Sequence, residues 1–360
     1  IYNDSDMYII RRYQYYSFVF VLLALVGSVK ATPEYEVIAL GRMEGYNNRS
    51  VAINDQGEVT GYMTAADGSH HTFLYSEGQV TFLPLSHWGS YSNRPYDINN
   101  QSEIVGHADY SNRRDGFLYK NDDMFNYHGR RLTAINDNGE TVLFGFDHGY
   151  ENQGYLYNTR TGNEMNLGNL GGDFTNPQDI NNSGQVVGSS KTADGKRHAF
   201  IYDNGTITDI NPLGNISNAL GINSSGKTVG YTIINGHPEA FLYSEGSLTL
   251  LGQIESAAYD INDNDEIVGS SSGDAFYYAD GTLHTLNNLI DPELGWDIFL
   301  ADEINIHGDI AASGYDAEGN EHALLLRKSA IPLPGGLILM LSGLVSVFAA
   351  SSRYSNRKQQ

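Results

Sequence analysis

The repeat that decides the fold is clearest at residues 179–188, which read Asp-Ile-Asn-Asn-Ser-Gly-Gln-Val-Val-Gly. Its constant part is Ile-Asn, then a turn that contains Gly, then Val and Gly. The Ile-Asn pair recurs throughout the chain, at Ile53-Asn54, Ile98-Asn99, Ile135-Asn136, Ile180-Asn181, Ile222-Asn223, Ile261-Asn262 and Ile304-Asn305. A period near 40 residues is typical of four-stranded blades or of helical solenoids.

Each unit predicts four short strands, a to d, and the local pattern therefore favours blades. Residues 133–136, 185–188, 198–202 and 248–252 show strands a to d, which are rich in Val, Ile, Phe, Tyr and Leu and separated by Gly, Asn or Asp. The Asn of Ile-Asn can bind the backbone amides that follow it, and Gly supplies the positive φ of a tight hairpin. Similar c–d turns are expected at Glu77-Gly78, Asn204-Gly205, Glu245-Gly246 and Asp280-Gly281.

The two ends of the repeat array indicate a closed ring. The last unit stops after its strand c, at residues 322–327, and a spare strand d lies before the first Ile-Asn, at residues 36–41. This spare strand can complete the seventh unit and so remove the exposed edges of an open array. We therefore predict an all-β, seven-bladed β-propeller of four-stranded antiparallel blades, closed by the N-terminal strand. An open β-solenoid is the alternative, but it gives no reason to split a unit.

Both termini differ from the array. Arg11 and Arg12 precede an apolar run at residues 18–26, and small residues follow, which is the pattern of a secretory signal peptide. An N-terminal core strand is the alternative. The predicted domains are a signal peptide with an upstream extension at 1–31, the propeller at 32–328 and a C-terminal tail at 329–360.

The tail has three parts. Pro332-Leu333-Pro334 comes first, an uncharged run follows, and Arg353, Arg357 and Lys358 come last. Residues 331–352 would form a transmembrane helix of about 33 Å, long enough for a bilayer core of about 30 Å. The basic end should stay cytoplasmic, which leaves the bulk of the protein outside.

Two resemblances follow from these motifs. The tail resembles the PEP-CTERM sorting tails of Gram-negative bacteria, with Pro-Leu-Pro in place of Pro-Glu-Pro, and this implies an exosortase-type processing enzyme as partner. An ordinary C-terminal anchor is the alternative. Residues 179–188 followed by His198-Ala199-Phe200 resemble the HAF-repeat family of extracellular bacterial proteins. That resemblance implies export and supplies no catalytic residue.

The composition excludes some functions and leaves others open. The net charge is −22, so nucleic acid is not an expected partner. There is no Cys, and we predict no cofactor, no metal site and no catalytic residue from motifs. Calcium is the one open alternative, at the acidic stretch of residues 260–266, although the turn that all units share also explains that stretch.

The a–b and c–d turns are short and uniform, whereas the b–c and d–a loops vary, and binding usually resides in variable loops on a rigid scaffold. The two longest predicted d–a loops, at residues 86–95 and 287–302, contain Trp88, Tyr91, Trp296 and Phe299. Exposed aromatic rings can stack on sugars, so these four are the predicted ligand-binding residues. The alternative is that the Trp side chains fill gaps between blades.

Together these features predict an exported, non-enzymatic repeat protein of the cell envelope, cell surface or extracellular matrix. Its expected role is binding or structural, with an extracellular polysaccharide as a candidate partner and the membrane reached through the terminal segments. The alternative function is an extracellular polysaccharide hydrolase or lyase, with paired carboxylates assembled across the channel of the propeller.

Overall fold

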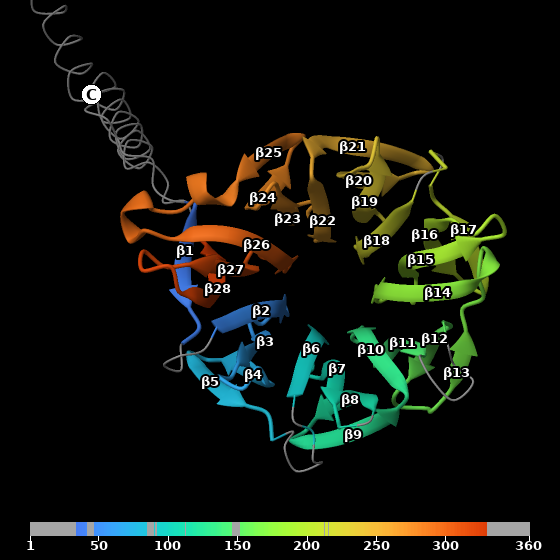
Figure 1. Ribbon diagram of the computed structural model, residues 1–360, viewed down its shortest axis with the longest axis horizontal. Coiled ribbons are helices and arrows are strands. Elements are labelled where there is room, and N and C mark those ends of the chain that lie inside the picture. The colour runs from blue at the N-terminus through green and yellow to red at the C-terminus, as the bar shows by residue number, and fades with distance from the viewer. Residues whose placement is uncertain are drawn as a thin grey trace, which may run out of the picture. The chain divides into compact units, whose positions relative to one another are not determined.

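Seven four-stranded antiparallel sheets stand around a central axis and form the blades of a propeller (Figure 1). The computed structural model describes residues 34–41, 47–84, 90, 92–111, 113–145, 152–211, 213–214 and 216–329, within a compact unit that spans Glu34–Ala330. In each blade, strands a to d follow one another from the axis to the rim. The predicted seven-bladed propeller is therefore confirmed.

The blades are numbered from the first Ile-Asn unit. Blade one contains β2 (Asn47–Ile53), β3 (Val59–Thr64), β4 (His70–Ser76) and β5 (Gln79–Phe82). Blade two contains β6 (Ser92–Ile98), β7 (Ile104–Asp109), β8 (Arg114–Lys120) and β9 (Asp123–His128). Blade three contains β10 (Arg130–Ile135), β11 (Glu140–Gly145), β12 (Gly154–Asn158) and β13 (Glu164–Asn166). Blade four contains β14 (Gly171–Ile180), β15 (Val186–Thr192), β16 (Arg197–Asp203) and β17 (Thr206–Asp209).

The remaining blades follow the same order. Blade five contains β18 (Ser217–Ile222), β19 (Thr228–Ile234), β20 (His237–Ser244) and β21 (Ser247–Ile254). Blade six contains β22 (Ser256–Ile261), β23 (Ile267–Ser271), β24 (Asp274–Ala279) and β25 (Thr282–Thr285). Blade seven contains β26 (Asp297–Ile304), β27 (Ile310–Tyr315), β28 (Glu321–Lys328) and β1 (Tyr35–Ala39). Two short 3-10 helices, η2 (Leu286–Asn288) and η3 (Pro292–Leu294), lie between blades six and seven.

The ring closes in blade seven, where the first strand of the chain pairs with the last. β1 runs antiparallel to β28, with Val37 opposite Leu326, and Figure 1 shows the two strands side by side. Tyr35 and Leu40 at the two ends of this segment are each 1 % exposed and belong to two separate hydrophobic cores. The predicted closure by the N-terminal strand is confirmed.

Every inner strand carries a β-bulge two residues before the repeat Ile. In blade four, for example, Pro177 pairs with Gly188 and Asp179 pairs with Val187, so Gln178 is the extra residue. A bulge bends its strand and re-aims the neighbouring side chains. The bulges therefore direct the residues just before each Ile toward the axis.

The bulge also explains the Gly of the Val-Gly motif. A Cβ added to Gly188 would lie 2.2 Å from the carbonyl oxygen of Asn176, and one added to Gly61 would lie 2.1 Å from that of Arg49. A Cβ on Gly61 would also meet the ring of Phe73 on strand c, at 2.7 Å. In these blades the Gly therefore lets the bulged inner strand and the Phe approach closely, whereas blades three and seven bulge at the same place with Leu143 and Ala312 at this position.

The hairpin turns have the backbone that their residues predict. Both central residues of the c–d turns at Glu77-Gly78, Asn204-Gly205, Glu245-Gly246 and Asp280-Gly281 have φ between 46° and 87°. Two positive φ values are what a type I′ turn requires. The predicted c–d turns are confirmed.

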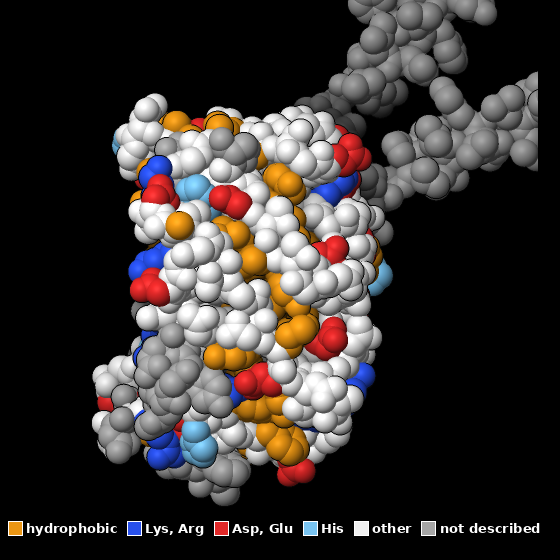
Figure 2. All heavy atoms as spheres, turned by 90° about the vertical axis from the view of Figure 1, so that its right-hand side faces the viewer, with side chains coloured by type: hydrophobic (Ala, Val, Ile, Leu, Met, Phe, Trp, Pro, Cys, Tyr) orange, Lys and Arg blue, Asp and Glu red, His pale blue; other side chains and the backbone are white. Residues whose placement is uncertain are grey.

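The outer strands leave hydrophobic side chains exposed on the rim. Phe125 and Met165, on strands d of neighbouring blades, are 48 % and 45 % exposed. Figure 2 shows hydrophobic side chains as a band along the rim, with charged side chains nearer its two edges. The polar chemistry of the domain therefore concentrates on the two faces, where the turns and loops lie.

The two predicted longest d–a loops are shorter in the structure than expected. The loop expected at residues 287–302 is shorter, because β26 begins at Asp297, and the loop expected to reach Pro95 ends where β6 begins at Ser92. The predicted signal peptide and the predicted transmembrane helix of the tail lie outside the described residues. Within those residues, no helix has the length and apolar character to cross a membrane.

Candidate functional site: the central channel and its two faces

The Asn of each Ile-Asn pair shapes its own turn. The Oδ1 atom of Asn181 accepts hydrogen bonds from the backbone amides of Ser183 and Gln185, at 3.0 and 3.1 Å. All seven turns have this pair of bonds to the second and fourth residues after the Asn. The role expected for this Asn is therefore confirmed.

The same Asn also joins its blade to the next. The Nδ2 atom of Asn181 donates to the carbonyl oxygen of Asn223 at 3.0 Å, and that of Asn305 donates to Asn54 at 3.1 Å. The series is closed: each Asn donates to the backbone of the next Asn around the ring, at 2.8 to 3.2 Å. These seven residues form what we call the Asn ring, which the turn pattern alone did not predict.

Substituting Asn181 by Asp should separate the two functions of this side chain. Asp keeps an oxygen for the two turn amides but loses the donor to Asn223, and it places a charge beside that carbonyl oxygen. Loss of a buried donor costs about 1–3 kcal/mol. We expect urea unfolding of Asn181→Asp to show that loss, whereas Asn163→Asp, at an exposed position, should cost under about 1 kcal/mol. Equal costs for the two variants would contradict the role of the Asn ring.

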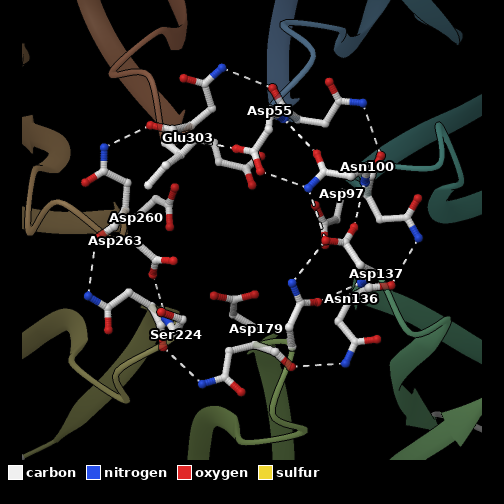
Figure 3. A pocket seen from close by; sticks show the side chains of 18 of the residues that line it. Asp55, Asp97, Asn100, Asn136, Asp137, Asp179, Ser224, Asp260, Asp263 and Glu303 are labelled. Carbon is white, nitrogen blue, oxygen red and sulfur yellow. Dashed lines mark hydrogen bonds between the residues drawn. The ribbon is translucent and has the colours of Figure 1, made fainter.

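Four carboxyl groups line the channel next to the Asn ring (Figure 3): Asp97, Asp179, Asp260 and Glu303. They stand directly before the repeat Ile in blades two, four, six and seven, where the other blades have Ala52, Ala134 and Gly221. Three of the four bridge two blades in the same way. Asp179, for example, accepts from the amide of Ile180 in its own blade and from that of Ile222 in the next.

These four acids satisfy all seven Ile amides. Asp97, Asp179 and Asp260 each accept from two amides, and Glu303 accepts from Ile53 across the closure of the ring, at distances of 2.6 to 2.9 Å. Charged acceptors make stronger hydrogen bonds than neutral ones. We refer to these acids as the channel carboxylates, and their first role is to hold adjacent blades together.

Two cavities meet at the channel carboxylates. The wider one holds about 240 Å³ and opens on the face of the Ile-Asn turns, where Asp55, Asp137 and Asp263 also line it. The second holds about 110 Å³ and is lined on the other side of the carboxylates by Tyr96, Tyr259 and Asp302, among others. The channel is therefore polar and acidic along the length that these residues line.

Burial in the channel makes these carboxyl groups weaker acids, so each keeps its proton to a higher pH than an exposed carboxyl group would. It raises the pKa of Asp97 and of Asp260 to about 7 and that of Asp179 to about 6, against the opposing effect of the amide donors. Burial also raises the pKa of Glu303, and the charge of Asp97 adds to it. Burial also raises the pKa of Asp302, to about 8.

These pKa values predict a stability that rises on mild acidification. An acid whose pKa is higher in the folded state contributes most stability below its unfolded pKa, near 4, and loses that contribution as the pH rises through 6 to 8. Acids with lowered pKa values, such as Asp115 and Asp316, oppose this below about pH 4. We expect the thermal midpoint to be on the order of 5 °C higher at pH 5 than at pH 8.

Differential scanning calorimetry from pH 4 to pH 8 measures this, with matched variants. Asp97→Asn should reduce the slope, and Asp203→Asn, at an exposed position, should not. A midpoint that is constant or rises toward pH 8 would show that the channel carboxylates are ionised at no cost.

The structure separates the four predicted ligand-binding aromatics. Trp88 and Tyr91 lie outside the described residues. Trp296 packs against the core of blades six and seven and meets the ring of His322 edge-on at 5.1 Å. Phe299 lies in β26 rather than in a loop, and its ring stacks on Tyr315 at 4.7 Å. Binding by these residues stays a prediction.

The acidic stretch at residues 260–266 has separate partners for its side chains. Asp260 accepts from backbone amides, Asp265 contacts Lys227, and Glu266 contacts Lys328 and Tyr277. In the described parts of the chain, no three His, Cys, Asp or Glu side chains lie close enough to hold a metal ion. The turn and these contacts account for the stretch without calcium.

The fold and the channel define the chain as a seven-bladed β-propeller protein. No protein-family model and no curated protein sequence matches it. Among solved structures it is similar to an oligogalacturonate lyase in complex with manganese, with a TM-score of 0.54 and 11 % identity over 83 % of this chain and 95 % of that one. It is also similar to the Pyrococcus horikoshii acylaminoacyl peptidase, with a TM-score of 0.50 and 10 % identity over 81 % of this chain and 53 % of that one. At such identities the likeness concerns the fold alone.

Proposed function

We propose that the chain is an exported, non-enzymatic binding or scaffolding protein, held at the cell envelope by its C-terminal tail. The proposal takes export and anchoring from the sequence, where residues 1–31 have the pattern of a signal peptide and residues 329–360 that of a sorting tail. An exosortase-type enzyme is the proposed processing partner, and an extracellular polysaccharide is the proposed ligand.

One observation carries the non-enzymatic part of this proposal. The acids that converge on the channel are the ones that a hydrolase would use, and each channel carboxylate already accepts backbone amides. An acid that holds two blades together must keep its position and its acceptors, which conflicts with the proton transfers of general acid–base catalysis. The channel acids are therefore better explained as structural groups.

Both ends of the propeller domain lie on the face opposite to the face of the b–c and d–a loops, and we call the latter the loop face. The Ser329 amide donates to the Glu34 carbonyl oxygen at 2.8 Å, so both ends leave the ring at one place. That place lies on the face of the Ile-Asn turns, because the Lys328 amide donates to Asp309 and its ammonium contacts Glu266, both in such turns. The longer b–c and d–a loops lie on the opposite face, the loop face, which we propose as the face that binds.

Localisation of the full chain in a Gram-negative host tests the anchoring. The intact chain should fractionate with the envelope, and deletion of residues 332–360 should release it into the medium. Deletion of residues 353–360 alone removes Arg353, Arg357 and Lys358 and should weaken retention through loss of the basic end. Equal retention of all three chains would contradict a sorting role for the tail.

A single observation favours the alternative, a hydrolase or lyase. Asp302 lines the smaller cavity, its Oδ2 atom is buried without a hydrogen-bond partner, and its raised pKa keeps it protonated at neutral pH. A protonated carboxyl group is what a general acid requires. A turnover screen on polysaccharides with the full chain and with Asp302→Asn decides between the two: turnover that Asp302→Asn abolishes would establish the enzyme, and binding without turnover would exclude it.

A further inference from the structure

Arginines and aromatic rings alternate along the loop face, the face of the b–c and d–a loops that lies opposite the Ile-Asn turns. Arg94 stacks over Tyr62 at 4.9 Å, Arg131 lies over both Tyr96 and Phe144 at 5.5 Å, and Arg197 lies over Phe174 at 4.6 Å. Arg49 continues the series over Phe299 at 5.5 Å. These residues come from the consecutive blades seven, one, two, three and four, and we call them the arginine–aromatic arc.

The repeat explains why the arc forms on this face. Arg49, Arg94 and Arg131 each stand four residues before the repeat Ile, near the start of an inner strand. Inner strands begin at the loop face and end at the Ile-Asn turns, so these three side chains lie near the loop face, remote from the Asn ring. Phe144 and Phe174 join neighbouring blades of the arc, with their rings 5.6 Å apart.

Among the residues that the structure describes, three of the four arginines have no acidic partner. Arg49 pairs with Glu321, but the described contacts of Arg94 and Arg131 are to His70 and Asn176, and that of Arg197 is to the ring of Phe174. Unpaired arginines are unexpected in a chain with 43 acidic and 21 basic residues. The Nε atom of Arg131 is, in addition, buried without a hydrogen-bond partner, so one donor of this guanidinium group is unsatisfied.

The neighbouring histidines are neutral. Burial first, with smaller effects from the charges of Arg114, Arg94 and Arg131, lowers the pKa of His107 to about 4 against the raising effect of Asp109. Burial and the charge of Arg94 likewise lower the pKa of His70. Both rings are therefore neutral at pH 7, and the positive charge of the arc belongs to its arginines.

We propose that the arc binds a linear sugar chain that carries carboxylates, with guanidinium groups on the carboxylates and aromatic rings against the sugar faces. The planar guanidinium fork matches a carboxylate in a bidentate way, and aromatic rings pack on the apolar faces of sugars. Repetition over five adjacent blades suits a chain of repeated units better than a single small molecule. This inference rests on the proposed function and names the ligand class of its loop face.

The same residue types also bind single-stranded nucleic acid, which is a polyanion like the proposed sugar chain, and the number of charged contacts that each ligand needs favours the sugar chain. Nucleic-acid binding commonly uses about 6–10 phosphate contacts, and the arc supplies three unpaired arginines within a chain of net charge −22. A sugar chain needs fewer charged contacts, because each ring also offers an apolar face. The acidic sugar chain is therefore the favoured ligand.

Calorimetric titration of the full chain with defined hexamers tests the inference. The probes are hexamers of mannuronic, guluronic and galacturonic acid, the methyl esters of each, and a single-stranded dT hexamer. At least one uronate hexamer should bind, its uncharged ester should bind at least tenfold more weakly, and added salt should weaken the charged interaction.

Variants of the three unpaired arginines locate the binding. Arg94→Gln, Arg131→Gln and Arg197→Gln should each reduce affinity about tenfold or more. Arg131→Lys should restore little of it, because Lys lacks the fork. Arg327→Gln, at an exposed position near the end of β28, is the matched control and should bind as the parent does. The thermal midpoint of each variant checks that the fold is retained.

Two results would overturn the inference: no uronate hexamer binds, or the triple Gln variant binds as tightly as the parent chain. Tighter binding of the dT hexamer than of every uronate would assign the arc to nucleic acid and overturn it as well. None of these results bears on the proposed anchoring at the envelope, because retention by the tail is measured by fractionation without any ligand. Loss of tail-dependent retention would, in turn, leave the binding data unchanged.

Discussion

Removal of residues 35–40 is expected to abolish cooperative folding of the propeller. This segment contains β1 and the buried Tyr35 and Leu40, which sit in the two hydrophobic cores on either side of blade seven. Loss of two such side chains alone costs about 6–10 kcal/mol, which compares with a whole-domain stability of about 5–15 kcal/mol. The deletion also exposes the edge of β28, so we expect aggregation as well.

The measurement is urea unfolding followed by circular dichroism, with light scattering for aggregation. Glu36→Ala serves as the matched control, because Glu36 lies on β1 with its side chain exposed, and it should leave the unfolding midpoint nearly unchanged. Addition of the peptide of residues 34–41 in trans should partly restore the transition. A cooperative transition at the parent midpoint in the deleted chain would mean that the ring does not depend on β1.

Gly188→Ala should be one of the more costly additions of a single methyl group in the repeat motif. The new Cβ would lie 2.2 Å from the Asn176 carbonyl oxygen and 2.8 Å from the Cα of Pro177, and both are backbone atoms that cannot rotate away. Overpacking of this kind costs about 1–3 kcal/mol and more where the backbone must move. We expect about 3 kcal/mol or more by urea unfolding, against the usual gain in strand propensity when Ala replaces Gly.

The chain offers a matched control for this substitution. Blade seven has Ala312 opposite Ala301, at the position that corresponds to Gly188, and its strand c carries Leu324 where the other blade has Phe200. Ala312→Gly should therefore cost only about 1 kcal/mol, from backbone entropy. If Gly188→Ala cost no more than this control, the close approach of the bulged inner strand would be refuted.

Much of the fold could be predicted because similar turn and strand residues recur in all seven units of the repeat. The Asn after each Ile fixed the a–b turns, the Glu-Gly, Asn-Gly and Asp-Gly pairs fixed the c–d turns, and the split seventh unit fixed the closure. The inner ends of the d–a loops were less predictable. Residues 297–302 have no alternation that marks a strand, and they pair in β26 through two irregularities of register.

The channel carboxylates were missed, although the sequence contains their signal. Asp97, Asp179, Asp260 and Glu303 all stand directly before a repeat Ile, which becomes visible only when the seven units are aligned. Their function could not be read from that alignment, because it needs the distance from one blade to the next. The small residues at the same position of other blades are explained in the same way: their Ile amides are satisfied by the acid of the preceding blade.

The arginine–aromatic arc was missed for a different reason. Its arginines stand at one repeat position in only three units, and its aromatic partners lie on different strands of different blades. Sequence reasoning looked for binding residues in loops and chose the two Trp-containing ones. The structure adds the starts of the inner strands, where rigid elements rather than loops hold the side chains.

A disulfide between the first and the last strand tests the closed ring most directly. The native chain has no Cys, and Glu36 and Arg327 form an exposed cross-strand pair of β1 and β28. In the full chain, Glu36→Cys combined with Arg327→Cys should oxidise to an intramolecular disulfide, seen as a shift on a non-reducing gel and as one linked peptide by mass spectrometry. Glu36→Cys combined with Asp203→Cys, in blade four, should remain reduced. Free thiols in the first pair, or disulfide-linked dimers in place of monomers, would contradict a ring that its own N-terminal strand closes.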